Sequence, residues 1–272
     1  MDRILIIAVN YNSYTELYDY IASIDVAASN SKSIVDVLVA DNTIEHPTPI
    51  NVANLNLRSI SVRSYIFKEN LGYLGAATKL LELIGKDYTI AYDFVIISNV
   101  DLKLSKSFFQ DLSNVNRDNV GWIVPSIYRI EDNSNENPFM TCRPSKLKLR
   151  FLCVLYSMPF MYKLYLRLHK QRRVASKHVY NMEMDIYAGM GSLIITTKSL
   201  LDKYYPYRFP AFMYGEELFF AELVRMAGLT TRLYPQIIAN DICGVSTGKL
   251  NTSVKCKMMK SGISSILKEY FS

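Results

Sequence analysis

Hydrophobic and polar positions in the first half of the chain form short apolar runs separated by longer amphipathic stretches. The apolar runs are rich in Val and Ile and predict β-strands at 4–9, 35–40, 60–64, 94–98 and 120–125. The amphipathic stretches predict helices at 14–28, 73–84 and 106–115, with Ser13 and Ser105 as caps of the first and third. This alternation predicts an α/β fold with a mostly parallel sheet and helices on both of its faces.

The alternation breaks between residues 131 and 185. A basic amphipathic insertion at 142–173 mixes Leu, Phe, Tyr and Met with Lys and Arg, and Pro159 should break any continuous helix there. The later pattern predicts a strand at 186–196, a helix from 216 to before Gly228, a short strand at 232–234 and a helix at 255–271. Because no repeat or low-complexity linker is present, we expect one domain at 1–246, with halves 1–126 and 127–246, and a helical tail at 247–272.

Composition narrows the class of protein. Half of the 272 residues are hydrophobic, so the chain can form a substantial core. The formal net charge of +6 predicts an anionic partner, but the sequence has no spacing typical of a nucleic-acid-binding module. The four cysteines are scattered, which is typical of a reducing compartment, and no run of about 20 apolar residues predicts a spanning helix. We therefore expect a cytoplasmic protein, or one bound peripherally to the inner face of the cell membrane.

Polar residues follow several of the predicted strands. Asn99 and Asp101 come directly after the apolar run at 94–98, where hard oxygen atoms suit Mg²⁺ or Mn²⁺. The alternative is a strand that ends in a polar turn with a helix cap. Asn10-Tyr11-Asn12, Asp41-Asn42 and the turn at 70–76 stand at the ends of other strands. Because ligands bind beyond the carboxyl ends of parallel strands, these positions predict one shared crevice.

Taken together, these motifs resemble those of the family 2 glycosyltransferases, which have the GT-A (Rossmann-like) fold. The resemblance is strongest to rhamnosyltransferase-like enzymes that build bacterial capsular and O-antigen polysaccharides. It spans the chain from Ile4 to about Ser246. The residues that carry it, in the order of the family, are Asn10-Tyr11-Asn12, Asp41-Asn42, Asn70-x-Gly72-Tyr73-x-Gly75-Ala76, Ser98-Asn99-Val100-Asp101 and Tyr214-Gly215-Glu216-Glu217.

The resemblance implies a UDP- or dTDP-linked sugar as donor and Mn²⁺ or Mg²⁺ as cofactor. Asp41 would accept a hydrogen bond from the base, and Asp101, supported by Asn99, would hold the ion that bridges the two phosphates. Asp241 stands where many relatives carry a His that contacts the metal or the phosphate. The donor site implied by the resemblance comprises Asn10, Tyr11, Asn12, Asp41, Asn42, Asn70, Gly72, Tyr73, Gly75, Asn99 and Asp101.

The acidic pair Glu216 and Glu217 has two interpretations. Two carboxylates in the first turn of a helix that begins after Gly215 are favoured by the helix dipole alone. The resemblance implies instead that Glu217 is the general base, with Glu216 in reserve, and that the reaction inverts the anomeric carbon. It also implies that Gly189-Met190-Gly191 and Tyr214 line the acceptor side, although 189–191 also fits a flexible strand entry.

The basic insertion likewise has two interpretations. Its apolar side packs on the sheet while its cations face water, or it lies on an anionic membrane. Lipid-linked glycan acceptors, common among relatives, favour the second. Two rival functions stay open beside the glycosyltransferase: a nucleotidyltransferase, whose phosphate loop is missing after the first strand, and a catalytically silent protein that binds nucleotide sugars or glycans.

Overall fold

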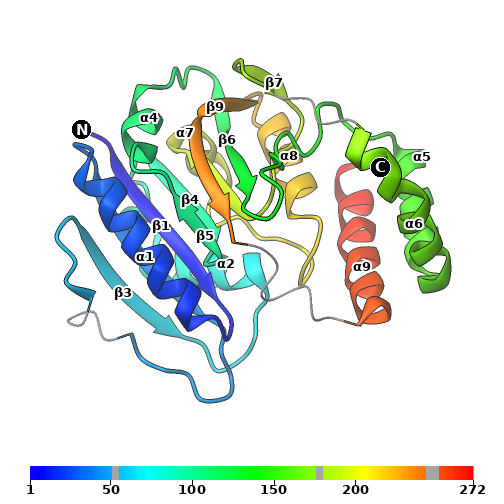
Figure 1. The fold of residues 1–272 in the computed structure, drawn as a ribbon, viewed down its shortest axis with the longest axis horizontal. Coiled ribbons are helices and arrows are strands. Elements are labelled where there is room, and N and C mark those ends of the chain that lie inside the picture. Colours follow the sequence, from blue (N-terminus) through cyan, green and yellow to red (C-terminus); the bar gives the residue numbers. More distant parts are fainter. Residues whose placement is uncertain (51–54, 176–179, 243–250, 272) are drawn as a thin grey trace.

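The computed structural model describes residues 1–50, 55–175, 180–242 and 251–271, with the backbone alone for 169–175. In this part of the chain nine strands form one sheet in the order β3-β2-β1-β4-β8-β6-β9-β5, with β7 paired to β9 (Figure 1). The strands are β1 Arg3–Asn10, β2 Ile34–Asp41, β3 Ile60–Ile66, β4 Phe94–Asn99, β5 Leu102–Leu104, β6 Val120–Arg129, β7 Met184–Ile186, β8 Leu193–Thr197 and β9 Thr230–Asp241.

The helices lie between and after these strands. They are α1 Tyr14–Ser29, α2 Tyr73–Ile84, α3 Lys86–Thr89, α4 Phe108–Asn114, α5 Lys146–Tyr156, α6 Pro159–Ala175, α7 Lys198–Tyr204, α8 Glu216–Met226 and α9 Thr252–Tyr270. The prediction for α2 matches both of its ends, where Gly72 and Gly85 have φ values of +74° and +82°. Both glycines take a left-handed backbone conformation that other residues avoid, so both ends are sharp.

The sheet is parallel over β3, β2, β1 and β4. The carboxyl ends of these four strands therefore meet at one edge. Beyond β4 the sheet is mixed, because β8 runs antiparallel to both β4 and β6, while β6 and β9 are parallel. The predicted α/β fold is confirmed.

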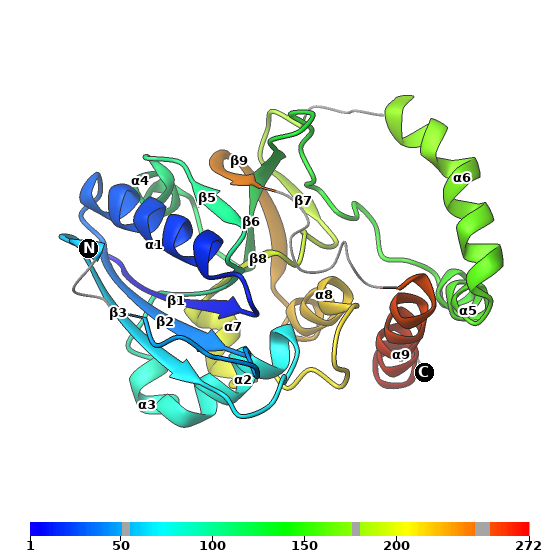
Figure 2. The same cartoon turned by 60° about the horizontal axis from the view of Figure 1, so that its bottom comes forward.

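Each face of the sheet carries its own apolar core (Figure 2). On one face α1 and α4 bury side chains such as Ile21 and Phe108 against the strands. On the other face α2, α7 and α8 do the same with residues such as Leu80 and Phe220. Trp122, the only Trp, lies within this second core.

Three predictions about elements are wrong. The strand expected at 186–196 is interrupted at 187–192, so that β7 pairs with β9 whereas β8 pairs with β4 and β6. The short strand at 232–234 belongs to the much longer β9, which runs beside β6 along almost its whole length. Ser105 is not the cap of the third predicted helix, because Ser107 occupies the cap position of α4. Ser13 does occupy the cap position of α1, but its hydroxyl donates to the Tyr11 carbonyl oxygen and accepts no hydrogen bond from the helix.

The basic insertion forms a helical hairpin. α5 ends at Tyr156 and α6 begins at Pro159, so the predicted break at this proline is confirmed. The hairpin contacts α9, which itself packs against α8, so α9 lies between the hairpin and the sheet domain (Figures 1 and 2). No helix among those described is both long enough and apolar enough to cross a membrane. Cys142, Cys153 and Cys256 are free thiols, and Cys243 lies outside the described residues.

Candidate active site

The carboxyl ends of β1 and β2 form a buried polar corner. Asn10 donates from Nδ2 to Asp41 Oδ1 at 3.1 Å, and Tyr14 donates its hydroxyl proton to Asp41 Oδ2 at 2.7 Å. The Thr43 backbone N–H adds a third hydrogen bond to Asp41 at 3.0 Å. Asn10 and Asp41 are almost fully buried. The Asp41 carboxylate is thus held in one orientation at the sheet edge where the resemblance places the base of a nucleotide.

The neighbouring Asn42 fixes the turn that leads into α2. It donates from Nδ2 to the Gly72 carbonyl oxygen at 2.9 Å and accepts from the Leu71 N–H at 3.3 Å. Asn70 closes the same turn, since its Oδ1 accepts from the Gly72 N–H at 2.9 Å. Four residues that belong to two predicted motifs therefore form one hydrogen-bonded unit.

The two glycines of this turn differ in their surroundings. A Cβ atom at Gly72 would lie 2.1 Å from the Phe212 carbonyl oxygen, so this position requires glycine. A Cβ at Gly75 would only make ordinary contact with Leu71, at 3.5 Å. Nothing within the protein therefore requires a glycine at position 75, which suits a position that a ligand approaches closely.

Tyr73 links this turn to the acidic residues. Its hydroxyl is buried and has no hydrogen-bond partner in the structure. Burial raises its pKa well above the ordinary value, and the carboxylates of Glu216, Glu217 and Asp101 raise it further. Glu216 and Glu217, predicted to be catalytic, and Asp101, predicted to bind the metal, therefore all lie near the phenol of Tyr73.

A second cluster of acidic residues includes Asp101. The Ile242 N–H donates to the Asp101 carbonyl oxygen at 2.9 Å, and Asp241 pairs with Leu102, so β5 and β9 bring Asp101 and Asp241 side by side. Glu136 joins them: burial, the charge of Asp241 and a hydrogen bond to it, and the charge of Asp101 raise its pKa to about 7. Its Oε2 is buried without a hydrogen-bond partner. No local pattern singles out Glu136, because it lies in a polar loop that is typical of a protein surface.

The oxygen atoms of this acidic group suit a divalent cation whose remaining coordination positions are filled by the substrate. Among the described residues no three His, Cys, Asp or Glu side chains form a ready-made metal site. Mg²⁺ is usually held by one or two carboxylates together with substrate phosphates and water. Asp101 and Asp241 both lie close enough to Glu136 to raise its pKa, and Glu136 Oε2, which is buried without a hydrogen-bond partner, leaves acceptor capacity near them.

The acidic pair lies at the start of α8, as predicted. Gly215, with φ +106°, occupies the cap position, and Glu216 Oε1 accepts from the Tyr214 N–H at 2.9 Å. Burial and the charge of Glu217 raise the pKa of Glu216 to about 8. Burial also raises the pKa of Glu217, whereas the backbone N–H groups of Glu217 and Gly191 oppose this rise. Glu217 is the more exposed of the two acids.

The 189–191 turn lies against this pair. A Cβ at Gly191 would lie 2.8 Å from Glu217 Oε1, so only glycine lets the turn approach the carboxylate. Asn137 Oδ1 accepts from the Met190 N–H at 2.7 Å and fixes the turn. A Cβ at Gly189 would lie 2.6 Å from Val124 and 3.2 Å from the indole of Trp122. The alternative of a flexible strand entry is therefore wrong, since the segment is a tightly packed turn.

Helix α9 covers the loop that precedes the acidic pair. A Cβ at Gly262 would lie 1.7 Å from the Tyr214 carbonyl oxygen, so helix and loop touch backbone to backbone. Tyr214 has φ +67°, and its hydroxyl is buried without a partner. Lys255 Nζ lies 5.8 Å from the centre of its ring. The predicted helical tail is therefore part of the wall beside the predicted acceptor residues.

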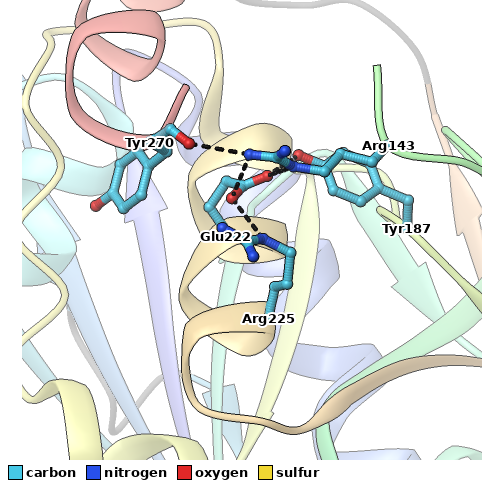
Figure 3. A network of polar contacts seen from close by, with 5 residues as sticks. All are labelled: Arg143, Tyr187, Glu222, Arg225 and Tyr270. Carbon is cyan, nitrogen blue, oxygen red and sulfur yellow. Dashed lines mark hydrogen bonds and ion pairs between the residues drawn. The ribbon is translucent and has the colours of Figure 1, made fainter. Parts of the chain in front are cut away.

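A charged network fastens this wall to α8 (Figure 3). Glu222 is fully buried and accepts from Arg143 at 2.7 and 3.1 Å, from the Tyr187 hydroxyl at 2.7 Å and from Arg225 at 2.8 Å. Arg143 also donates to the Tyr270 carbonyl oxygen at 2.9 Å. One carboxylate thus joins α8, the end of α9 and the segment that leads into α5. In the sequence, nothing distinguishes Arg143 from the other cations of the basic insertion.

Three further residues predicted for the nucleotide-sugar site are Tyr11, Asn12 and Asn99. Tyr11 is largely exposed, and the Asn12 N–H donates to Thr43 Oγ1 at 3.0 Å. Asn99 is the last residue of β4, and its N–H donates to the Ser192 carbonyl oxygen at 2.9 Å. The stretch 243–246, at the end of the predicted domain, lies outside the described residues.

Comparison with known proteins gives structural neighbours alone. No protein-family model and no curated protein sequence matches the chain. Among solved structures it is similar to the mannosyltransferase PcManGT from Pyrobaculum calidifontis in complex with GDP-Man and Mn²⁺, at a TM-score of 0.53 and 12% identity over 90% of this chain and 58% of that one. It is also similar to GalNAc-T7 with UDP, GalNAc and Mn²⁺, at a TM-score of 0.62 and 12% identity over 98% of this chain and 48% of that one.

A third neighbour is S. aureus TarS, at a TM-score of 0.52 and 11% identity, over 99% of this chain and 44% of that one. The chain thus spans about half the length of the solved structures that it matches. At these identities the likeness concerns the fold. The chain has the GT-A-type fold of these glycosyltransferases.

Proposed function

We propose that the protein is an inverting, metal-dependent glycosyltransferase. It transfers a sugar from a UDP- or dTDP-linked donor to a lipid-linked glycan at the cytoplasmic face of the membrane, in the synthesis of a surface polysaccharide. The observation that carries this proposal is that the predicted acids lie near two shared neighbours. Glu216, Glu217 and Asp101 are close enough to raise the pKa of Tyr73, and Asp101 and Asp241 are close enough to raise that of Glu136. The structural neighbours, solved with GDP-Man or with UDP and GalNAc, and with Mn²⁺, support a nucleotide sugar as donor and a divalent cation as cofactor.

The donor binds along the edge that the Asp41 corner and the α2 turn form. Asp41 is already oriented by three hydrogen bonds and accepts one from the N–H of uracil or thymine. Gly75 leaves room for the nucleotide, and Asp101 and Asp241 would hold a Mn²⁺ or Mg²⁺ ion. When bound, the ion neutralises the charge that develops on the leaving diphosphate.

Glu217 acts as the general base toward the acceptor hydroxyl. As its carboxylate takes the proton, the acceptor oxygen forms a bond to the anomeric carbon, and the bond from that carbon to the diphosphate oxygen breaks with its electron pair. Attack from the opposite face inverts the configuration. The N–H of Gly191 stabilises the carboxylate form, and the glycine keeps space open in front of it. Replacing Glu217 by Gln should lower kcat by about 10²–10⁴-fold with the donor affinity preserved.

A thermal-shift panel tests the donor site first. UDP-, dTDP- and GDP-sugars are each measured with and without Mn²⁺, and a ligand at a hundredfold excess over Kd stabilises the native state by about 2.7 kcal/mol. We expect a metal-dependent shift that Asp101→Ala abolishes and Glu217→Gln retains. The absence of any shift would refute the donor site.

Product analysis separates the rival functions. Release of nucleoside diphosphate with a sugar-bearing acceptor supports the glycosyltransferase. Formation of a nucleotide sugar with release of pyrophosphate would identify a nucleotidyltransferase. Donor binding without turnover on a panel of lipid-linked glycans would favour the silent binding protein.

A further inference from the structure

The segment between Glu136 and Glu183 has an extreme charge pattern. It contains ten Lys and Arg residues and no Asp or Glu, although the whole chain has a net charge of only +6. Five of these cations lie exposed on the α5–α6 hairpin, and within the described part of the chain none of them forms an ion pair. They are Lys146, Lys148, Arg150, Lys163 and Arg167. The side chains of Lys170, Arg172 and Arg173 lie outside the described residues.

The same hairpin exposes large apolar side chains. Of the 23 large hydrophobic residues that are exposed in the described part of the chain, nine lie between residues 147 and 168. Their spacing places three on one stripe of α5 and three on one stripe of α6. These six are 42–74% exposed: Leu147, Phe151, Val154, Met161, Leu164 and Leu168. Among the hairpin side chains that the structure describes, only Leu149, Leu155 and Tyr162 are buried, so the exposed apolar stripes do not pack on the sheet as one interpretation of the sequence expected.

A groove of about 640 Å³ runs between α5 and α9. Its lining joins the apolar side chains of Val154 and Leu267 with the cations Lys146, Arg150 and Lys268. A surface that offers apolar contact and cationic hydrogen-bond donors side by side matches an amphiphile whose head group is an anionic phosphate.

We propose that the α5–α6 hairpin, together with the adjoining edge of α9, docks the protein on an anionic phospholipid membrane. The cations contact the head groups, and the two apolar stripes enter the boundary between head groups and acyl chains. A second copy of the chain fits poorly as the occupant, because the five exposed cations of a hairpin that contains no Asp or Glu would face five others. As α9 also contacts the loop before Glu216, docking here would bring a lipid-linked acceptor to the proposed site, a step that rests on the proposed function.

Co-sedimentation of the full chain with vesicles tests the docking surface independently of catalysis. Phosphatidylcholine vesicles are compared with vesicles that also contain phosphatidylglycerol. We expect binding only to the anionic vesicles and weaker binding as salt is raised. Replacing the five exposed hairpin cations by Gln should lower the partition coefficient by about 10³–10⁴-fold, since each is worth about a fivefold change near the surface.

A matched control removes the same charge elsewhere. Lys32, Arg58, Lys79, Lys86 and Lys106 are exposed cations remote from the hairpin in sequence, and their replacement by Gln should leave most of the binding intact. A third variant, Phe151→Ser with Leu164→Ser, keeps every charge and should also weaken binding, because the apolar stripes contribute.

Several outcomes would overturn the proposal: no binding to anionic vesicles, equal binding to both kinds of vesicle, or equal loss in the hairpin and control variants. Self-association in solution that the Phe151→Ser, Leu164→Ser variant abolishes would assign the surface to a second copy instead. Failure of the proposed function is distinguishable, since Asp101→Ala should lose the donor-induced thermal shift while retaining vesicle binding. The hairpin variant should retain the donor-induced shift.

Discussion

The buried Glu222 network should contribute measurably to stability. The replacement Glu222→Gln preserves the size of the side chain and removes its charge. At present Oε1 accepts from Arg143 and Tyr187, and Oε2 accepts from Arg143 and Arg225. An amide nitrogen at either position would face N–H or O–H donors in place of an acceptor. The variant therefore loses about half of these hydrogen bonds, and the two arginines lose their counter-ion.

The size of the effect follows from burial. Breaking a buried ion pair typically costs about 3–5 kcal/mol. The Arg143 and Arg225 side chains are 39% and 51% exposed, so both can regain water, and we expect a loss of about 2–3 kcal/mol. For a chain of this size that corresponds to a decrease in Tm of about 5–10 °C. Glu131→Gln is the matched control, because its pair with Arg129 lies on the surface and is worth about 0–1 kcal/mol.

The pH dependence gives the sharper test. Burial alone would raise the pKa of Glu222, but hydrogen bonds from Arg143, Tyr187 and Arg225 outweigh it and lower the pKa. The Glu222 carboxylate therefore stabilises the folded state at pH values above the ordinary pKa of a carboxyl group. This stabilisation is lost as the pH falls through the lower pKa that Glu222 has in the folded state. Melting curves of wild type and Glu222→Gln should therefore converge in acid. Equal Tm losses in Glu222→Gln and Glu131→Gln, or a difference that persists in acid, would refute this reasoning.

Two further predictions concern the glycine turn and the acidic pair. Gly72→Ala should cost at least about 2 kcal/mol in denaturant unfolding, because φ is +74° and the added Cβ meets the Phe212 carbonyl oxygen. Gly75 lies in the first turn of α2 with space for a Cβ, so Gly75→Ala should leave the free energy of unfolding unchanged or slightly higher and weaken donor binding in the thermal-shift assay. Burial and the charge of Glu217 raise the pKa of Glu216 to about 8, so the folded state retains a proton that the unfolded chain releases. Stability should therefore fall as the pH rises from the ordinary carboxyl range to about 8, and Glu216→Gln should flatten that slope in pH-dependent melting curves.

The sequence predicted the elements whose signals are local. The strands β1, β2 and β4 are continuous apolar runs, and glycines with left-handed φ end α2, so no distant residue was needed to find them. The length of β9 could not be predicted in this way. Pro235 interrupts its pattern, yet residues 235–237 bulge outward while Tyr234 and Ile238 still pair with successive residues of β6, more than 100 positions earlier.

The same distinction between local and distant signals applies to the candidate site. Motifs at strand ends could be placed at one sheet edge from topology alone, because parallel strands share that edge. Contacts between distant segments could not: Glu136 acquires its meaning only from Asp241, and the buried hydroxyl of Tyr73 only from the acids around it. Gly191 stands against Glu217 although no local pattern relates the two.

The position of Trp122 gives the protein an intrinsic spectroscopic probe. Its indole is the only one in the chain, is fully buried and leaves Nε1 without a hydrogen bond. It touches the place that a side chain at Gly189 would fill, and its ring lies 6.0 Å from that of Phe220 on α8. Fluorescence excited at the red edge of the tryptophan band therefore originates at one dry point between the 189–191 turn and the helix that carries the acidic pair. A change in its intensity or emission wavelength on adding an acceptor would follow events on that side of the site without any label.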